Sequence, residues 1–205
     1  MLAEYQRELR EARVSRLVAL PTQRLETMLL EMGIAFDDLN DVKAAIAGVG
    51  VVVTPRDAVE FTFTREIHPV QRYNTEAFPV FYSALMQETC VEEIQYHLAT
   101  SIGVGHPRYY HFVEVQFSGV ALDLCGHEGV HPELISASSA GYPFCQQLAS
   151  AARLDGIDAL YAPSARHQGG VCVPVFYLHA LSDPEITGSL RFYSEGQAVT
   201  YERIV

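Results

Sequence analysis

The chain has 205 residues, of which 49% are hydrophobic and 19% are charged. This is the composition of a globular protein with a substantial core, so intrinsic disorder is excluded as its main state. Its apolar runs fall far short of the roughly 18–20 residues that a membrane-spanning helix needs. The formal net charge is −11, and because an acidic surface repels phosphate, direct binding to nucleic acid is not expected.

The cysteines and histidines show no pattern of metal ligands or disulfides. No two of the four cysteines form a CxxC pair, which favours reduced thiols in a cytosolic protein. The eight histidines match no ligand spacing, so we expect no metal site. Residues 1–17 are charged throughout and lack the apolar stretch of a signal peptide, and we therefore expect a cytoplasmic location.

The first 50 residues are predicted to be helical. Apolar residues recur at near-helical spacing over residues 2–18, with Glu and Arg between them, and Pro21 ends this helix. Helical signals continue over residues 22–32 and 41–47. We interpret residues 1–49 as a helical extension whose apolar stripe covers either this domain or a second copy, which favours a homodimer.

Residues 50–205 have a different pattern, in which short β-rich runs are mixed with two helical segments. The predicted strands cover residues 50–53, 60–64, 80–85, 111–117, 159–162 and 171–178. The predicted helices cover residues 89–100 and 142–154. This mixture indicates an α+β fold.

Two arginines stand out in the first of two segments that are rich in polar residues, residues 63–98. Arg65 ends a strand-like run, and Arg72 lies in a turn-rich stretch. Two neighbouring guanidinium groups in an acidic protein are costly unless an anion such as a pyrophosphate joins them through bidentate hydrogen bonds. The alternative is that both arginines pair with surface carboxylates such as Glu66 and Glu76.

The second segment covers residues 155–176. A predicted strand delivers Ser164 to a turn that is followed by Gly169-Gly170. A small hydroxyl at a strand end, beside glycines, commonly meets a ligand. The alternative is an ordinary turn in which Ser164 bonds to its own backbone.

Taken together, the two segments resemble the RES domain, a family named for its Arg, Glu and Ser residues. The resemblance extends over about residues 50–180, and it rests on the order and spacing of five features. These are Arg65 at the end of a strand-like run, the turn Arg72-Tyr73-Asn74, the strand Tyr82-Ser83-Ala84, the helix start from Thr89 to Glu93, and the stretch from Asp155 to Gly170 that contains Pro163-Ser164-Ala165-Arg166.

The sequence departs from the RES pattern around the second arginine. The family has Gly-Gly-Arg-Trp-Asn there, whereas this chain has Val-Gln-Arg-Tyr-Asn at residues 70–74. The stretch between Arg65 and Arg72 is only six residues, which is shorter than in the family. Arg56 is therefore an alternative to Arg65 as the first arginine.

The resemblance implies a fold similar to that of ADP-ribosyltransferase toxins, with a central cleft that binds NAD. Characterised RES proteins resemble the toxins of toxin–antitoxin pairs, and they break the nicotinamide–ribose bond of NAD. Different members pass ADP-ribose to phosphate, to water or to a protein. Their antitoxins resemble helix-turn-helix proteins that plug the cleft. We therefore expect NAD as substrate, phosphate or water as acceptor, and an antitoxin of this kind as partner.

The resemblance also assigns roles to individual residues. A carboxylate beside the ribose would stabilise the growing positive charge of an oxocarbenium-like transition state, and Glu93 is the candidate. Its neighbour Glu92 is an alternative, although only Glu93 falls eleven residues after Tyr82, as in the family pattern.

The remaining candidates would hold the substrate. Arg65 and Arg72 would bind the pyrophosphate or the attacking phosphate. Tyr82 would flank the flat nicotinamide cation, and Ser164 would bond a phosphate or the nicotinamide amide. Arg166 would assist, with a surface salt bridge as its alternative role. We assign catalysis to Glu93, Arg72 and Ser164, and NAD binding to Arg65, Arg72, Tyr82, Ser164 and Arg166.

Two other functions fit the same residues. The cleft would also suit a protein-directed ADP-ribosyltransferase. The altered turn at residues 70–74 favours instead a degenerate, non-catalytic RES-like domain that binds a nucleotide or a partner protein. Release of nicotinamide from NAD separates catalysis from binding.

Overall fold

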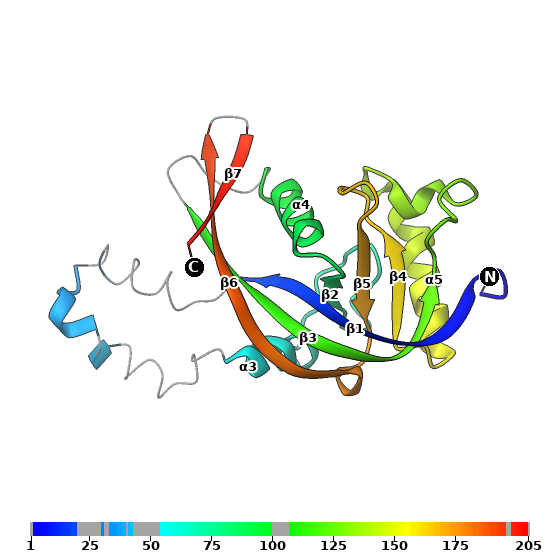
Figure 1. Cartoon of the computed structure of the whole chain (residues 1–205), viewed down its shortest axis with the longest axis horizontal. Helices are drawn as coiled ribbons and strands as arrows, with labels where there is room; N and C mark the ends of the chain where they lie inside the picture. Colours follow the sequence, from blue (N-terminus) through cyan, green and yellow to red (C-terminus); the bar gives the residue numbers. More distant parts are fainter. Residues whose placement is uncertain are drawn as a thin grey trace.

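A computed structural model describes residues 2–19, 30, 33–39, 41–42, 54–99, 107–195 and 198–204. Within these ranges the chain forms one mixed β-sheet with helices packed around it (Figure 1). This arrangement confirms the predicted α+β class.

Seven strands of the described chain form the sheet, in the order β1-β2-β5-β4-β3-β6-β7. They are β1 (Gln6–Val18), β2 (Phe81–Ala84), β3 (Arg108–Asp123), β4 (Ala159–Pro163), β5 (Val171–Val175), β6 (Leu181–Glu195) and β7 (Ala198–Arg203). Because β1 also pairs with β3, the strands β1, β2, β5, β4 and β3 close into a barrel. The strands β6 and β7 continue the sheet outward from β3.

Three α-helices of the described chain lie around this barrel (Figure 1). They are α3 (Pro55–Thr64), α4 (Gln87–Leu98) and α5 (Tyr142–Leu154). Short 3-10 helices are η1 (Phe36–Asp38), η2 (Pro132–Ile135), η3 (Ser139–Gly141) and η4 (Leu178–Ala180). Among the described residues, no helix is long and apolar enough to cross a membrane.

Strand β1 replaces the helix that was predicted over residues 2–18, and that prediction is wrong. The helix prediction rested on the near-helical spacing of apolar residues, and the Glu, Arg, Leu and Ala of this segment are also good helix formers. In the fold, β1 pairs antiparallel with β3 along its whole length and buries Val14 and Leu17. These long-range contacts outweigh the local propensity, as tertiary packing commonly does.

Charged side chains of β1 also bind neighbouring elements. Three arginines of β1 pair with carboxylates: Arg7 with Asp155, Arg10 with Asp123 at 2.6 Å, and Arg13 with Glu185. The alternating Glu and Arg residues that suggested a solvated helix are therefore the polar positions of a strand.

Helix α3 contradicts the strand that was predicted over residues 60–64. A capping box starts this helix, because Thr54 Oγ1 accepts a hydrogen bond from the Asp57 backbone N–H at 3.1 Å and the Asp57 carboxylate accepts one from the Thr54 backbone N–H at 2.9 Å. Pro55 occupies the first helical position, which it favours. The β-forming residues further along continue a helix that has already been nucleated.

The other predicted elements with described residues are confirmed. The strands at 80–85, 111–117, 159–162 and 171–178 correspond to β2, β3, β4 and β5, and the helices at 89–100 and 142–154 correspond to α4 and α5. Most of the helices at 22–32 and 41–47, and all of the strand at 50–53, lie outside the described residues. The domain boundary near residue 50 falls in the same part of the chain.

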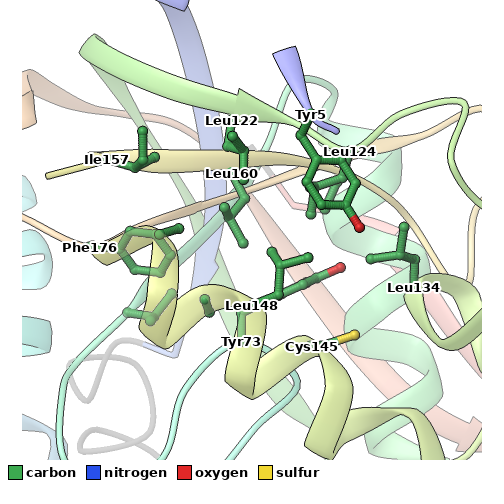
Figure 2. Packing of buried hydrophobic residues seen from close by; sticks show 14 of the residues in the cluster. Tyr5, Tyr73, Leu122, Leu124, Leu134, Cys145, Leu148, Ile157, Leu160 and Phe176 are labelled. Atoms are coloured by element: carbon green, nitrogen blue, oxygen red, sulfur yellow. The ribbon is translucent and has the colours of Figure 1, made fainter. Parts of the chain in front are cut away.

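Helix α5 packs on the sheet over a buried cluster that Figure 2 shows from close by. Leu148 of the helix lies against Leu122 of β3 and Leu160 of β4. Tyr73 enters the same cluster and is only 2% exposed. The turn that carries Arg72 is therefore anchored in the core.

Helix α4 packs on another part of the sheet. Its Val91 and Leu98 form a cluster with Leu17 of β1 and Phe192 of β6. This packing fixes the rotation of the helix, and Glu93 then lies on a different face of α4, in the wall of a cavity.

Candidate functional site

A cavity of about 190 Å³ opens between α4, the start of α5 and the strands β1, β2 and β5. The charged and aromatic residues in its wall that bear on chemistry are Arg16, Arg72, Tyr82, Glu93 and Arg166. Four of these five were predicted as site residues. Arg16 was not.

Glu93, in the wall of this cavity, meets Ser164 of the turn after β4, although 71 positions separate them in the chain. The Ser164 hydroxyl donates to Glu93 Oε1 at 2.7 Å. The Cys172 thiol lies 3.7 Å from the same oxygen. The carboxylate is therefore held in one orientation, while Glu92 is exposed on the helix. This placement favours Glu93 over Glu92 as the carboxylate of the site.

The turn after β4 positions Ser164. Its hydroxyl oxygen accepts hydrogen bonds from the backbone N–H groups of Arg166 at 3.1 Å and His167 at 3.0 Å. Ser164 thus bonds to its own backbone, as the alternative prediction had it, and also to Glu93. Its hydroxyl proton already has an acceptor, so in this structure Ser164 orients the carboxylate.

The two glycines of this turn have structural tasks. Gly169 has a φ of 77°, a conformation that side chains disfavour. A Cβ on Gly170 would lie 2.7 Å from Thr89 Oγ1 and 2.8 Å from His167 Nδ1. These two atoms are themselves 2.8 Å apart, so the close approach of Gly170 preserves a contact between the turn and α4.

Arg72 is bound to backbone carbonyls. Its Nη1 donates to the carbonyl oxygens of Glu133 at 3.0 Å and Leu134 at 3.3 Å, and its Nη2 donates to that of Ser136 at 2.7 Å. Its guanidinium carbon lies 5.2 Å from the centre of the Tyr142 ring. No carboxylate of the described chain forms an ion pair with Arg72, so its positive charge is not neutralised there.

Tyr82 contributes its ring to the cavity and its hydroxyl to the turn. The hydroxyl donates to Asn74 Oδ1 at 2.9 Å and accepts from the Tyr73 backbone N–H at 2.8 Å. Burial raises the pKa of Tyr82 well above its usual value, so the phenol stays neutral. Tyr82 is thus bonded to Tyr73 and Asn74, and it orients the turn that carries Arg72.

Arg166 stands at the cavity wall between α4 and the segment after η2. Its guanidinium carbon lies 3.4 Å from the centre of the Tyr96 ring, and its Nη2 donates to the Ala137 carbonyl at 2.8 Å. The Tyr96 hydroxyl donates to the same carbonyl at 3.0 Å. The predicted surface salt bridge of Arg166 is not found among the described residues.

A second hollow, of about 560 Å³, adjoins the first. The two share Pro163, Ala165 and Arg166 in their walls. The turn after β4 thus lies between two neighbouring hollows.

Arg65 and Arg56 are not brought into the cavity wall. Arg56 is an exposed residue of α3 that pairs with Glu60 at 2.7 Å. Arg65 ends α3, and its Nε is buried without a hydrogen-bond partner. The pKa of Arg16 is lowered chiefly by burial and also by the nearby charge of Arg65. Of these two candidates, only Arg65 approaches the site.

Arg16 is the site residue that sequence reasoning missed. It lies on β1, in the segment predicted to be a helix, where arginines and glutamates lie between the apolar residues. Its Nη1 donates to Thr62 Oγ1 at 3.0 Å, and its guanidinium carbon lies 4.8 Å from the centre of the Phe81 ring. If residues 6–18 had been predicted as a strand, Arg16 would have been placed in the sheet. The sequence around Arg16 contains no signal that indicates such a strand.

The thiols beside the cavity are held in their neutral form. Burial raises the pKa of Cys90 to about 12 and that of Cys172 well above its usual value. Nucleophilic chemistry by either cysteine would need a thiolate, which this environment disfavours. The carboxylate of Glu93 and the guanidinium groups of the arginines remain as charged groups in the cavity wall.

A comparison with protein families bears on most of the chain. The family model of the RES domain matches residues 53–195. The chain belongs to the RES domain family. No curated protein matches the chain. The match covers Arg72, Tyr82, Glu93 and Ser164, whereas Arg16 and the whole of β1 precede the part of the chain that matches the RES domain.

Proposed function

We propose that this RES domain cleaves the nicotinamide–ribose bond of NAD and transfers ADP-ribose to phosphate or water. The observation that carries the proposal is the fixed carboxylate of Glu93, in a cavity wall that also contains guanidinium groups without carboxylate partners. A carboxylate suits a reaction in which positive charge develops, and free guanidinium groups suit a phosphorylated substrate. We further propose a fold of the ADP-ribosyltransferase type, which the closed barrel with its flanking helices supports.

The reaction needs few groups because the leaving group is already activated. The bond between the ribose C1 atom and the pyridinium nitrogen breaks, and its electron pair stays on the nitrogen, so that nicotinamide leaves as a neutral molecule. Positive charge grows on the ribose, and Glu93 stabilises it. An oxygen of phosphate or water then forms a bond to C1, with loss of a proton when water attacks.

The other residues of the site would bind and orient the substrate. Tyr82 offers a ring face to the nicotinamide cation. Arg72 and Arg166 would bind the pyrophosphate, since both retain N–H groups beyond those used on backbone carbonyls. The second hollow beside Arg166 would take the adenosine half of NAD.

The resemblance also suggests a biological role, that of a toxin in a toxin–antitoxin pair. Such a toxin would act in the cytoplasm, as a monomer or a homodimer, and a helix-turn-helix antitoxin would restrain it. Transfer of ADP-ribose to a protein, and a binding role without catalysis, are the competing functions.

Release of nicotinamide is the decisive measurement. In Glu93→Gln the side chain keeps its size and loses its charge, so we expect the rate to fall by roughly 10²–10³. The matched control is Glu92→Gln, an exposed neighbour on the same helix, which should keep the rate of the unaltered protein.

Mass spectrometry of the products identifies the acceptor. A phosphorylated ADP-ribose that depends on added phosphate indicates phosphorolysis, and plain ADP-ribose indicates hydrolysis. Nicotinamide release with ADP-ribose attached to a protein would indicate the protein-directed enzyme. Binding of NAD without any nicotinamide release would contradict the proposed reaction.

A further inference from the structure

The turn after β4 contacts helix α4 through two side-chain pairs that lie one helical turn apart. The Ser164 hydroxyl donates to Glu93 Oε1 at 2.7 Å, and His167 Nδ1 lies 2.8 Å from Thr89 Oγ1. Because Thr89 precedes Glu93 by one turn of α4, the two side chains lie on the same face of the helix. Both residues belong to the cavity wall. The turn is therefore held at two points to the face of α4 that carries the carboxylate.

The two contacts are also joined within the turn. The backbone N–H of His167 donates to Ser164 Oγ at 3.0 Å. The backbone N–H of Gly170 donates to the His167 carbonyl at 2.9 Å, and the Gly170 carbonyl accepts from the Ser164 N–H at 2.8 Å. A displacement of His167 would therefore move a donor away from the hydroxyl that orients Glu93.

Hydrogen bonds have to position this turn, because hollows lie on both of its sides. Pro163, Ala165 and Arg166 line the cavity and the second hollow, and residues 167–170 line the second hollow. A segment with open space on two sides has fewer van der Waals contacts to hold it. Thr89 is 0% exposed in the first turn of α4, so its hydroxyl bonds where water does not compete. The contact with Thr89 thus ties the turn to a buried point of the helix.

We propose that Thr89 and His167 are positioning residues, which clamp the turn after β4 onto α4 and thereby keep the Ser164 hydroxyl on the Glu93 carboxylate. The inference rests on the proposed function for the reaction that this orientation serves. A carboxylate that is already oriented stabilises developing positive charge without reorganising during the reaction. Loosening the clamp should therefore reduce the rate more than the binding of NAD.

Steady-state kinetics of nicotinamide release test the clamp. Thr89→Val keeps the shape of the side chain and loses the hydroxyl, so we expect kcat to fall by roughly two- to tenfold, the effect of one neutral hydrogen bond. The KM for NAD should change by less than about twofold, because the arginines of the cavity wall are unaltered. Thr89→Ser and His167→Asn retain a polar group at the contact, and each should keep more of the rate than Thr89→Val and His167→Ala, respectively.

Ser189→Ala is the matched control for Thr89→Val. Ser189 forms the same kind of contact, with its hydroxyl 2.7 Å from His111 Nδ1, and both residues lie outside the cavity wall. Loss of this hydroxyl should lower the melting temperature, as Thr89→Val does, but leave kcat unchanged. Equal values of kcat in the two variants would mean that Thr89 only stabilises the fold, and would overturn the inference.

A double-mutant cycle shows whether Thr89 acts through Ser164. If it does, the variant that combines Thr89→Val with Ser164→Ala should release nicotinamide no more slowly than Ser164→Ala alone, because the clamp then has no hydroxyl to position. Rate losses that multiply in the double variant would assign Thr89 a separate role and would contradict the clamp.

The ¹³C signal of the Glu93 carboxyl carbon provides a readout that does not depend on activity. We expect this NMR signal to shift in Thr89→Val and to stay in place in Ser189→Ala. If Thr89→Val does not fold, His167→Ala takes its place in each measurement. An unchanged signal would overturn the inference whether or not NAD is cleaved. A shifted signal in a protein whose unaltered form releases no nicotinamide would refute the proposed function and leave the clamp standing.

Discussion

Ser164 shows how a single hydroxyl can set the chemistry of this site. It holds the Glu93 carboxylate at 2.7 Å, and two backbone N–H groups hold its oxygen in turn. In Ser164→Ala the carboxylate loses a charge-assisted hydrogen bond worth about 1.5–3 kcal/mol, so we expect nicotinamide release to fall by roughly 10- to 100-fold.

Rescue by a conservative variant distinguishes this positioning role from a general loss of structure. Ser164→Thr keeps the hydroxyl that donates to Glu93, so it should restore much of the rate. Nicotinamide release in Ser164→Ala at the rate of the unaltered protein would show that the hydroxyl does not act through Glu93.

Arg72 combines a structural task with its expected role in binding. Its bonds to the carbonyls of Glu133, Leu134 and Ser136 tie the turn before β2 to the 3-10 helix η2. We expect Arg72→Ala to lower the free energy of unfolding by about 1.5–3 kcal/mol, since the carbonyls lose a charged donor. Urea denaturation measures this change directly.

The same substitution should weaken binding of NAD. Arg153→Ala offers a comparison, because Arg153 is also stacked on aromatic rings but lies outside the cavity wall. A variant at Arg72 that binds NAD with unchanged affinity would leave the residue with its structural task alone.

At the scale of elements, a histidine links strands β3 and β6. His111 Nδ1 lies 2.7 Å from the Ser189 hydroxyl, and burial lowers the pKa of His111 below its usual value. Below a pH of about 6.5 the unfolded chain therefore takes up a proton that the folded chain resists. We expect the contribution of neutral His111 to the free energy of unfolding to be fully present above that pH and to be lost as the pH decreases below it.

Chemical denaturation between about pH 5 and pH 8 tests this dependence. His111→Gln keeps a polar side chain and removes the titration, so it should reduce the slope, which for one proton is at most about 1.4 kcal/mol per pH unit. Part of the dependence of the unfolding free energy on pH should remain in this variant, because the pKa of His97 is also lowered, chiefly by desolvation. An unaltered slope in His111→Gln would exclude this residue as a source of the pH dependence.

For the whole molecule, β1 is the strand that closes the barrel. It pairs with β2 on one side and with β3 on the other. A variant without residues 1–19 retains every residue that matches the RES domain, yet it lacks this closure and exposes the edge of β3. We expect it to lose cooperative thermal unfolding in circular dichroism.

Removal of β7 provides the control for that truncation. β7 is the last strand in the sheet and lies outside the closed barrel, so its loss should lower the melting temperature but preserve a single cooperative transition. Cooperative unfolding of the variant without residues 1–19 would show that the barrel closes without β1.

Some features of this protein could be predicted because they depend on neighbours in the chain. Helix α5 was placed at its observed bounds, since its apolar spacing and the Asp155-Gly156 ending are local signals. The spacing between Tyr82 and Glu93 was also informative, because the strand and the helix that carry them follow one another directly. These local relationships, together with the order of the motifs, indicated the RES domain.

Other features depend on residues that are far apart in the chain, and only the tertiary structure decided them. The sequence of β1 favours a helix by propensity, and its strand conformation follows from pairing with β3 more than 90 residues later. Contacts between distant parts of the chain also produce the hydrogen bond between Ser164 and Glu93, and they bring Arg16 into the cavity wall. Local propensity is worth only a few tenths of a kcal/mol per residue, whereas a full ladder of hydrogen bonds and buried side chains outweighs it. The sequence by itself therefore determined the family and the α+β class and indicated four of the five candidate residues in the cavity wall, and the closure of the barrel determined which arginine of β1 faces the cavity.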